Sequence, residues 1–135
     1  MPESDPALKA LKRVEEKVDE IHGMFSVSNR AMRKQVLEEL IEYFTKPKPQ
    51  KTALNIFLIL DGKNSRLWYI KNLRKKKIRV LPNNFSAECR KLVKLKYIEA
   101  VKMGRIRTYR RNPEYDRLDI PKDLKKILGK RGLIA

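Results

Sequence analysis

One stretch of sequence, NNFSAECRKLVKLKYIEAVKMGRIRTYRR, decides the fold and covers residues 83–111. In its first half, apolar residues such as Phe85, Cys89 and Leu92 recur at helical spacing. From Tyr97 the apolar period changes to two, and Gly104 can adopt the positive φ that a hairpin loop requires. The stretch therefore predicts a helix followed at once by a β-hairpin.

The hairpin can be predicted strand by strand. YIEAV is expected to form the outgoing strand, KMG the turn and RIRTYR the returning strand. Because side chains alternate along a strand, Arg107 and Tyr109 should share one side with Arg105. The opposite side of the returning strand should carry Ile106 and Thr108.

Apolar spacing and capping residues predict five further helices, over about residues 6–25, 30–44, 52–60, 65–76 and 122–129. We expect Thr52 and Ser65 to cap the third and fourth of these, and Pro82 to mark the start of the helix that precedes the hairpin. The helix over 65–76 is expected to face the core with Leu67, Trp68, Ile70 and Leu73. The predicted fold class is therefore mainly α with a small β-hairpin.

The first helix carries a narrow apolar seam with spacings of four, three, four and so on, which is typical of a coiled coil. This favours pairing of two chains through the seam, and a simple amphipathic helix lying on its own domain is the alternative. The predicted dimerisation residues are Leu11, Val14, Val18, Ile21 and Phe25.

Two prolines in KPKPQK, residues 46–51, predict an extended spacer. We therefore expect a helical dimerisation segment over 1–46, a linker over 47–51, a domain over 52–120 and a basic C-terminal helix or tail over 121–135.

Positive charge is concentrated in the C-terminal part of the chain. The sequence carries 33 Lys and Arg against 16 Asp and Glu. Residues 1–50 hold nine of each sign, so the whole excess of +17 lies in residues 51–135, which have 24 basic and 7 acidic side chains. A Lys-rich surface adapted to high temperature would carry Glu beside its Lys. The asymmetry favours a polyanionic partner, nucleic acid above all.

The sequence argues against several other classes of protein. One Cys and one His provide no all-protein zinc site, and we expect no cofactor. No catalytic motif is present, so an enzyme is not expected. The lone Cys89, the absence of a secretory signal and the lack of a long apolar run predict a cytoplasmic, nucleoid-associated protein without a membrane partner.

The pattern L-x-x-L-x-Y-I-E in residues 92–99, followed by G-R-x-R-x-Y-R in 104–110, resembles winged helix-turn-helix regulators of archaea and bacteria. The coil-plus-winged-helix order is similar to that of small proteins of archaea, their viruses and plasmids. The resemblance implies a recognition helix and a wing, although the connection before the helix is longer than the three to four residues of the tightest such units.

The resemblance also implies which residues contact duplex DNA. On the recognition helix these are Asn83, Asn84, Ser86, Arg90, Lys91 and Lys94; on the wing they are Lys102, Arg105, Arg107 and Arg110; on the flank they are Lys71, Arg74 and Lys75. Asn84 and Arg90 suit adenine and guanine, and capping or phosphate contact is the alternative for each.

These expectations combine into a homodimeric transcriptional regulator that binds double-stranded DNA and blocks or recruits the transcription machinery. A DNA-organising or plasmid-partition protein would use the same surface with less base reading. An interaction module for RNA polymerase, a replication complex or RNA is a further alternative.

Overall fold

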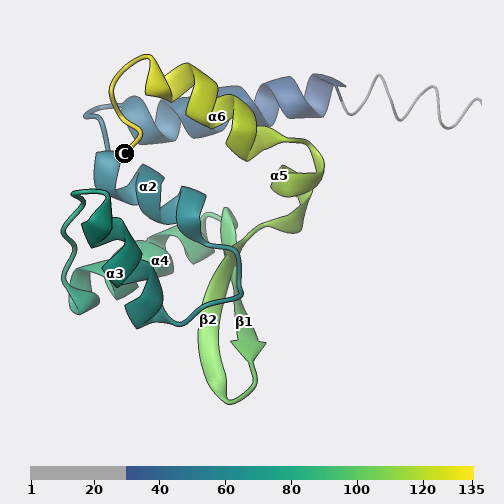
Figure 1. Ribbon diagram of the computed structural model, residues 1–135. Coiled ribbons are helices and arrows are strands. Elements are labelled where there is room, and N and C mark those ends of the chain that lie inside the picture. Colours follow the sequence, from purple (N-terminus) through teal and green to yellow (C-terminus); the bar gives the residue numbers. More distant parts are fainter. Residues whose placement is uncertain (1–29) are drawn as a thin grey trace, which may run out of the picture. The chain divides into compact units, whose positions relative to one another are not determined.

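The computed structural model describes residues 30–135 and is mainly helical with one small antiparallel hairpin, as the sequence predicts (Figure 1). A helix over 30–45 comes first. The remaining elements are α2 (Lys51–Ile59), α3 (Arg66–Lys75), α4 (Pro82–Lys94), β1 (Ile98–Met103), β2 (Ile106–Arg111), α5 (Pro113–Arg117) and α6 (Ile120–Gly129). The chain divides into two compact units, Met1–Gln35 and Val36–Ala135, and the second contains every labelled element.

Helix α2 lies at the centre of the second unit because its sequence is apolar on all sides. Five consecutive residues, Ala53 to Phe57, are buried, which is the pattern of a core helix. The helix begins one residue earlier than predicted, so Thr52 does not cap it; Gln50 occupies the N-cap position and makes no side-chain cap bond. Across the described residues, no helix is long and apolar enough to span a bilayer.

The segment predicted as an extended spacer forms a compact turn instead. The Gln50 backbone N–H donates to the carbonyl of Phe44 at 2.7 Å, and its side-chain amide donates to the carbonyl of Tyr43 at 2.6 Å. Phe44 is fully buried and its ring lies 5.5 Å from that of Phe57 in α2. The residues on both sides of the predicted linker therefore belong to one core, and the boundary expected at 47–51 falls inside the second unit.

Helix α3 is capped as predicted but is rotated about its axis. The Ser65 hydroxyl accepts from the backbone N–H of Trp68 at 3.2 Å. Tyr69 and Leu73 are the buried residues of the helix, whereas Leu67 and Trp68 are 66% and 42% exposed. The prediction that Leu67 and Trp68 face the core is wrong, because Tyr69 fills that side and its hydroxyl donates to Asp61 Oδ1 at 2.6 Å.

Helices α3 and α4 both end in a Schellman motif with lysine at the left-handed position. Lys77 has φ 65° and Lys96 has φ 64°. After α4, Tyr97 N donates to Leu92 O and Lys96 N donates to Val93 O, both at 3.0 Å, and the corresponding bonds follow α3. The connection between α3 and α4 runs from Lys76 to Leu81, and Pro82 starts α4 as predicted.

Both strands of the hairpin begin one residue later than predicted, and the loop has two residues rather than the three predicted. Met103 pairs with Ile106, so Gly104 and Arg105 form a two-residue loop and Lys102 stays in β1. Gly104 has φ 63°, as the first position of a type II′ loop requires. The hairpin projects beyond the helices (Figure 1).

The C-terminal segment is part of the same core rather than a tail. The NPEY turn predicted after the hairpin forms the short helix α5, with Asn112 as its cap. In α6, Ile120, Leu124 and Leu128 are all fully buried, because apolar residues at a spacing of four form a single stripe.

Candidate nucleic-acid interface

Helix α4 buries one stripe and exposes a polar one. Phe85, Cys89 and Leu92 are buried. The opposite side carries Asn83, Ala87, Arg90 and Lys94, which are spaced by four, three and four residues. Ala87 is half-buried and the other three are exposed. The predicted contact residues Asn83, Arg90 and Lys94 therefore lie on one outward face, with Asn84 and Lys91 along one flank.

Two of the predicted residues on α4 have intramolecular partners. The Ser86 hydroxyl accepts from Arg66 Nη1 of α3 at 2.8 Å, so Ser86 helps to join the two helices. Lys91 lies 3.7 Å from Glu88, a loose ion pair on an exposed surface. The second carboxylate oxygen of Glu88 is buried without a hydrogen-bond partner among the described residues.

One face of the hairpin carries cations at its outer end. The register places Lys102 directly opposite Arg107, and Ala100 opposite Tyr109, on the same face. Lys102 and Arg107 are exposed, and within residues 30–135 neither forms an ion pair with a carboxylate. Two like charges directly opposite each other destabilise a hairpin unless an anion lies nearby. Arg105 occupies the loop next to them.

The other hairpin face is neutralised. Arg110 pairs across the strands with Glu99 and forms an ion pair with it. Arg110 thus lies on the opposite face from Arg107, which separates it from the other predicted contact residues of the hairpin.

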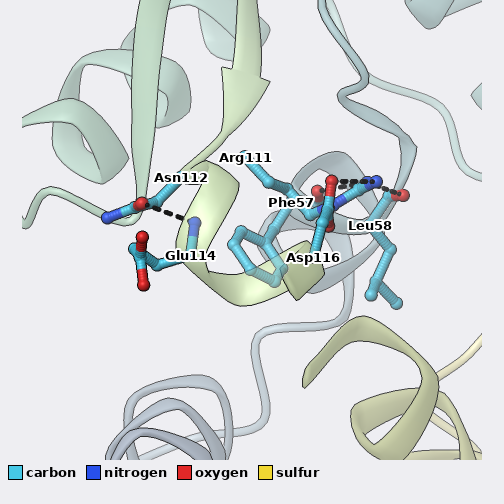
Figure 2. A network of polar contacts seen from close by, with 6 residues as sticks. All are labelled: Phe57, Leu58, Arg111, Asn112, Glu114 and Asp116. Atoms are coloured by element: carbon cyan, nitrogen blue, oxygen red, sulfur yellow. Dashed lines mark hydrogen bonds and ion pairs between the residues drawn. The ribbon is translucent and has the colours of Figure 1, made fainter. Parts of the chain in front are cut away.

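Arg111 has a structural role (Figure 2). Its guanidinium lies between the Asp116 carboxylate, at 2.9 Å, and the carbonyl of Leu58, at 2.5 Å. Leu58 is in the last turn of α2, where carbonyl groups lack helical partners. Next to it, the Asn112 side chain accepts from the backbone N–H of Glu114 at 3.1 Å (Figure 2). Arg111 therefore ties β2 to the ends of α2 and α5.

A network around the loop after α2 fixes the base of the hairpin. Thr108, which is 1% exposed, donates its hydroxyl to the Asn64 carbonyl at 2.5 Å. Asp61 forms an isolated bridge to Arg110 and accepts from Tyr69. Partial burial acts to raise the pKa of Asp61, but hydrogen bonds from Tyr69, Lys63 and Asn64 lower it below its ordinary value. The Asp61 carboxylate is thus held in its charged form by the contacts that position the hairpin.

A cleft of about 340 Å³ joins α4 to the cationic face of the hairpin. It is lined by Val93 and Lys96 at the end of α4, by Ile98, Glu99 and Ala100 of β1, and by Asn112. Ala100 belongs to the same face as Lys102. The cleft therefore adjoins the end of α4 and the inner part of the hairpin face that carries Lys102 at its outer end.

The predicted flank residues Lys71, Arg74 and Lys75 are exposed on α3. Arg74 lines a second cleft of about 380 Å³ together with Asn84 and the apolar residues Ile70, Val80 and Leu81. The structure thus brings Arg74 and Asn84 together. The C-terminal end of α3 lies near α6, as shown by a separate cleft that is lined by Lys76, directly after α3, and by Lys125 of α6.

Cys89 is a buried thiol on the inner side of α4. Burial raises its pKa to about 12, and the charge of Glu88 acts in the same direction. Within residues 30–135, no group of three or more His, Cys, Asp and Glu side chains is placed to hold a metal ion. The predicted dimerisation residues, Leu11 to Phe25, lie outside the described residues.

The predicted contact residues do not include Lys96, which lines the cleft beside β1, or Arg66, which donates to Ser86. Lys96 follows the end of α4 and Arg66 meets Ser86 where α3 contacts α4, so only the tertiary structure shows where these two side chains lie.

In comparisons with known proteins, no family model, no curated protein and no solved structure matched the chain.

Proposed function

We propose that the protein binds double-stranded DNA through a winged helix-turn-helix domain and acts as a homodimeric transcriptional regulator. The order of α2, the Asp61 bridge, α3, α4 and the hairpin resembles that of winged helix domains. In this proposal α4 enters the major groove and the hairpin follows the adjacent backbone.

One observation carries the proposal: the directly opposed pair of Lys102 and Arg107, without a carboxylate partner among residues 30–135, on the hairpin that directly follows α4 and its outward cations. The one carboxylate in the two strands, Glu99, pairs with Arg110 on the opposite face of the hairpin. A surface arranged in this way is suited to a row of phosphates.

The test is duplex binding by fluorescence anisotropy over a series of salt concentrations, with Arg107→Ala and Arg131→Ala compared. Both variants remove one exposed arginine that forms no ion pair within residues 30–135, so they have the same net charge, and Arg131 lies beyond α6, outside the proposed interface. Each phosphate contact contributes about 0.9 to the logarithmic salt slope. Arg107→Ala should lower the slope by about that amount per chain, and Arg131→Ala should leave it unchanged. Equal effects of the two variants would contradict the proposed interface.

Footprinting distinguishes a regulator from a DNA-organising protein. A regulator should protect a discrete operator, whereas an organising protein should coat long stretches of DNA. Sedimentation of the full chain, with and without Val14→Asp and Ile21→Asp, tests the proposed dimer, because a charge in a heptad seam opposes pairing.

A further inference from the structure

A cleft lies between the end of α4 and β1, the two neighbouring elements from which the proposed interface is built. Three of its six lining residues, Val93, Ile98 and Ala100, are apolar. The carboxylate that lines it, Glu99, is already paired with Arg110. Lys96 forms no ion pair with the described residues and is exposed, so the cleft has an unneutralised positive charge.

Lys96 is held in place by its backbone. At φ 64° its Cβ approaches the following carbonyl oxygen, and residues other than glycine, asparagine and aspartate rarely adopt this conformation. The Schellman bonds and a 3.3 Å bond from Asn112 Nδ2 to the Lys96 carbonyl hold this conformation. Strained residues persist only where several surrounding contacts determine them. The side chain of Lys96 therefore starts from a rigid point at the edge of the cleft.

We propose that this cleft receives the sugar-phosphate backbone of one DNA strand and that Lys96 binds its phosphate. The apolar lining residues suit the sugar, and the single cation suits the phosphate. The contact carries no sequence information, because every nucleotide presents the same backbone. The proposal rests on the proposed DNA binding and adds a positioning site between groove and wing.

Lys77 provides a matched control. It has the same residue type, the same position in a Schellman motif and nearly the same φ, 65°. It follows Lys76, which lines a different cleft with Lys125 of α6. Replacing either lysine by glycine removes the same charge and relieves the same backbone strain.

The experiment uses the full chain with Lys96→Gly and Lys77→Gly, measured by thermal unfolding and by duplex binding at several salt concentrations. Both variants should raise Tm by about 2–5 °C, since glycine suits this conformation. Only Lys96→Gly should lower the logarithmic salt slope by about 0.9. That slope corresponds to an affinity loss of about eightfold at 0.1 M salt, and it should be equal for duplexes of different sequence.

The outcomes separate the two proposals. If the unaltered protein does not bind duplex, the proposed function fails. If it binds and Lys96→Gly keeps the original slope, or if Lys77→Gly lowers the slope equally, the cleft is not a phosphate site while DNA binding stands. Lys96→Asn, which tolerates a left-handed backbone, should reproduce the lost slope and so separates charge from glycine flexibility.

Discussion

The buried amide of Asn55 is expected to hold the C-terminal residues against the core helix. Asn55 is 6% exposed and lies in α2. Its Nδ2 donates to the carbonyls of Lys51, at 2.7 Å, and Leu133, at 2.9 Å, and its Oδ1 accepts from Ala135 N at 3.1 Å. Asn55→Ala removes two bonds between segments that are far apart in sequence.

The magnitude follows from these contacts. Each lost bond costs about 0.5–1.5 kcal/mol, and a buried group left without a partner adds to that. The better helix propensity of alanine returns about 0.5 kcal/mol. The expected net loss is about 2 kcal/mol in the free energy of unfolding, or about 8–16 °C in Tm for a domain of this size.

Asn72→Ala is the matched control, because Asn72 is also helical and its Nδ2 also donates to the carbonyl four residues earlier, that of Trp68, at 2.8 Å. Asn72 has no bond to another segment in the described residues, so its replacement should be neutral or stabilise by about 0.5 kcal/mol. Urea unfolding followed by circular dichroism measures both variants. Equal stability of the two variants, within about 0.5 kcal/mol, would refute the reasoning.

Four further predictions concern the core and the base of the hairpin. Thr108→Val should lower the free energy of unfolding by about 1–2 kcal/mol in urea titrations, because the Asn64 carbonyl loses its donor; no loss would mean that this bond does not hold the hairpin. The lowered pKa of Asp61 stabilises the fold above the unfolded value of 3.8, and this stability is lost as pH falls through the folded pKa. Acid unfolding should therefore depend less on pH in Asp61→Asn, and an unchanged acid transition would contradict this role. Burial raises the pKa of Tyr97 and Tyr115 to about 12. The neutral phenols therefore contribute their full share to the stability of the fold below about pH 10, and this contribution is lost between that pH and 12. Absorbance titration should show both tyrosines ionising only as the protein unfolds. Cys89 should react with a thiol reagent only after denaturant is added, since its pKa is raised to about 12, and rapid reaction of the native protein would contradict its burial.

Local patterns in the sequence determined the type and order of most elements. The apolar spacing of residues 83–95 predicts α4, and the change of period at Tyr97 predicts the hairpin. Ser65 and Pro82 are capping signals that act within one helical turn, so they could be recognised without a partner. The concentration of charge in residues 51–135 is likewise a property of composition alone.

Only the tertiary structure decided which apolar side chains are buried and which charged side chains form ion pairs. Leu67 and Trp68 are exposed because Tyr69 occupies the inner side of α3 through a bond to Asp61. Arg110 and Arg111 are neutralised by Glu99 and Asp116, whereas Lys102 and Arg107 form no ion pair with any residue from 30 to 135. In the sequence these cations look alike. Their difference arises from pairing across strands and between helices, and a local pattern carries no information about partners that the folded chain brings from far away.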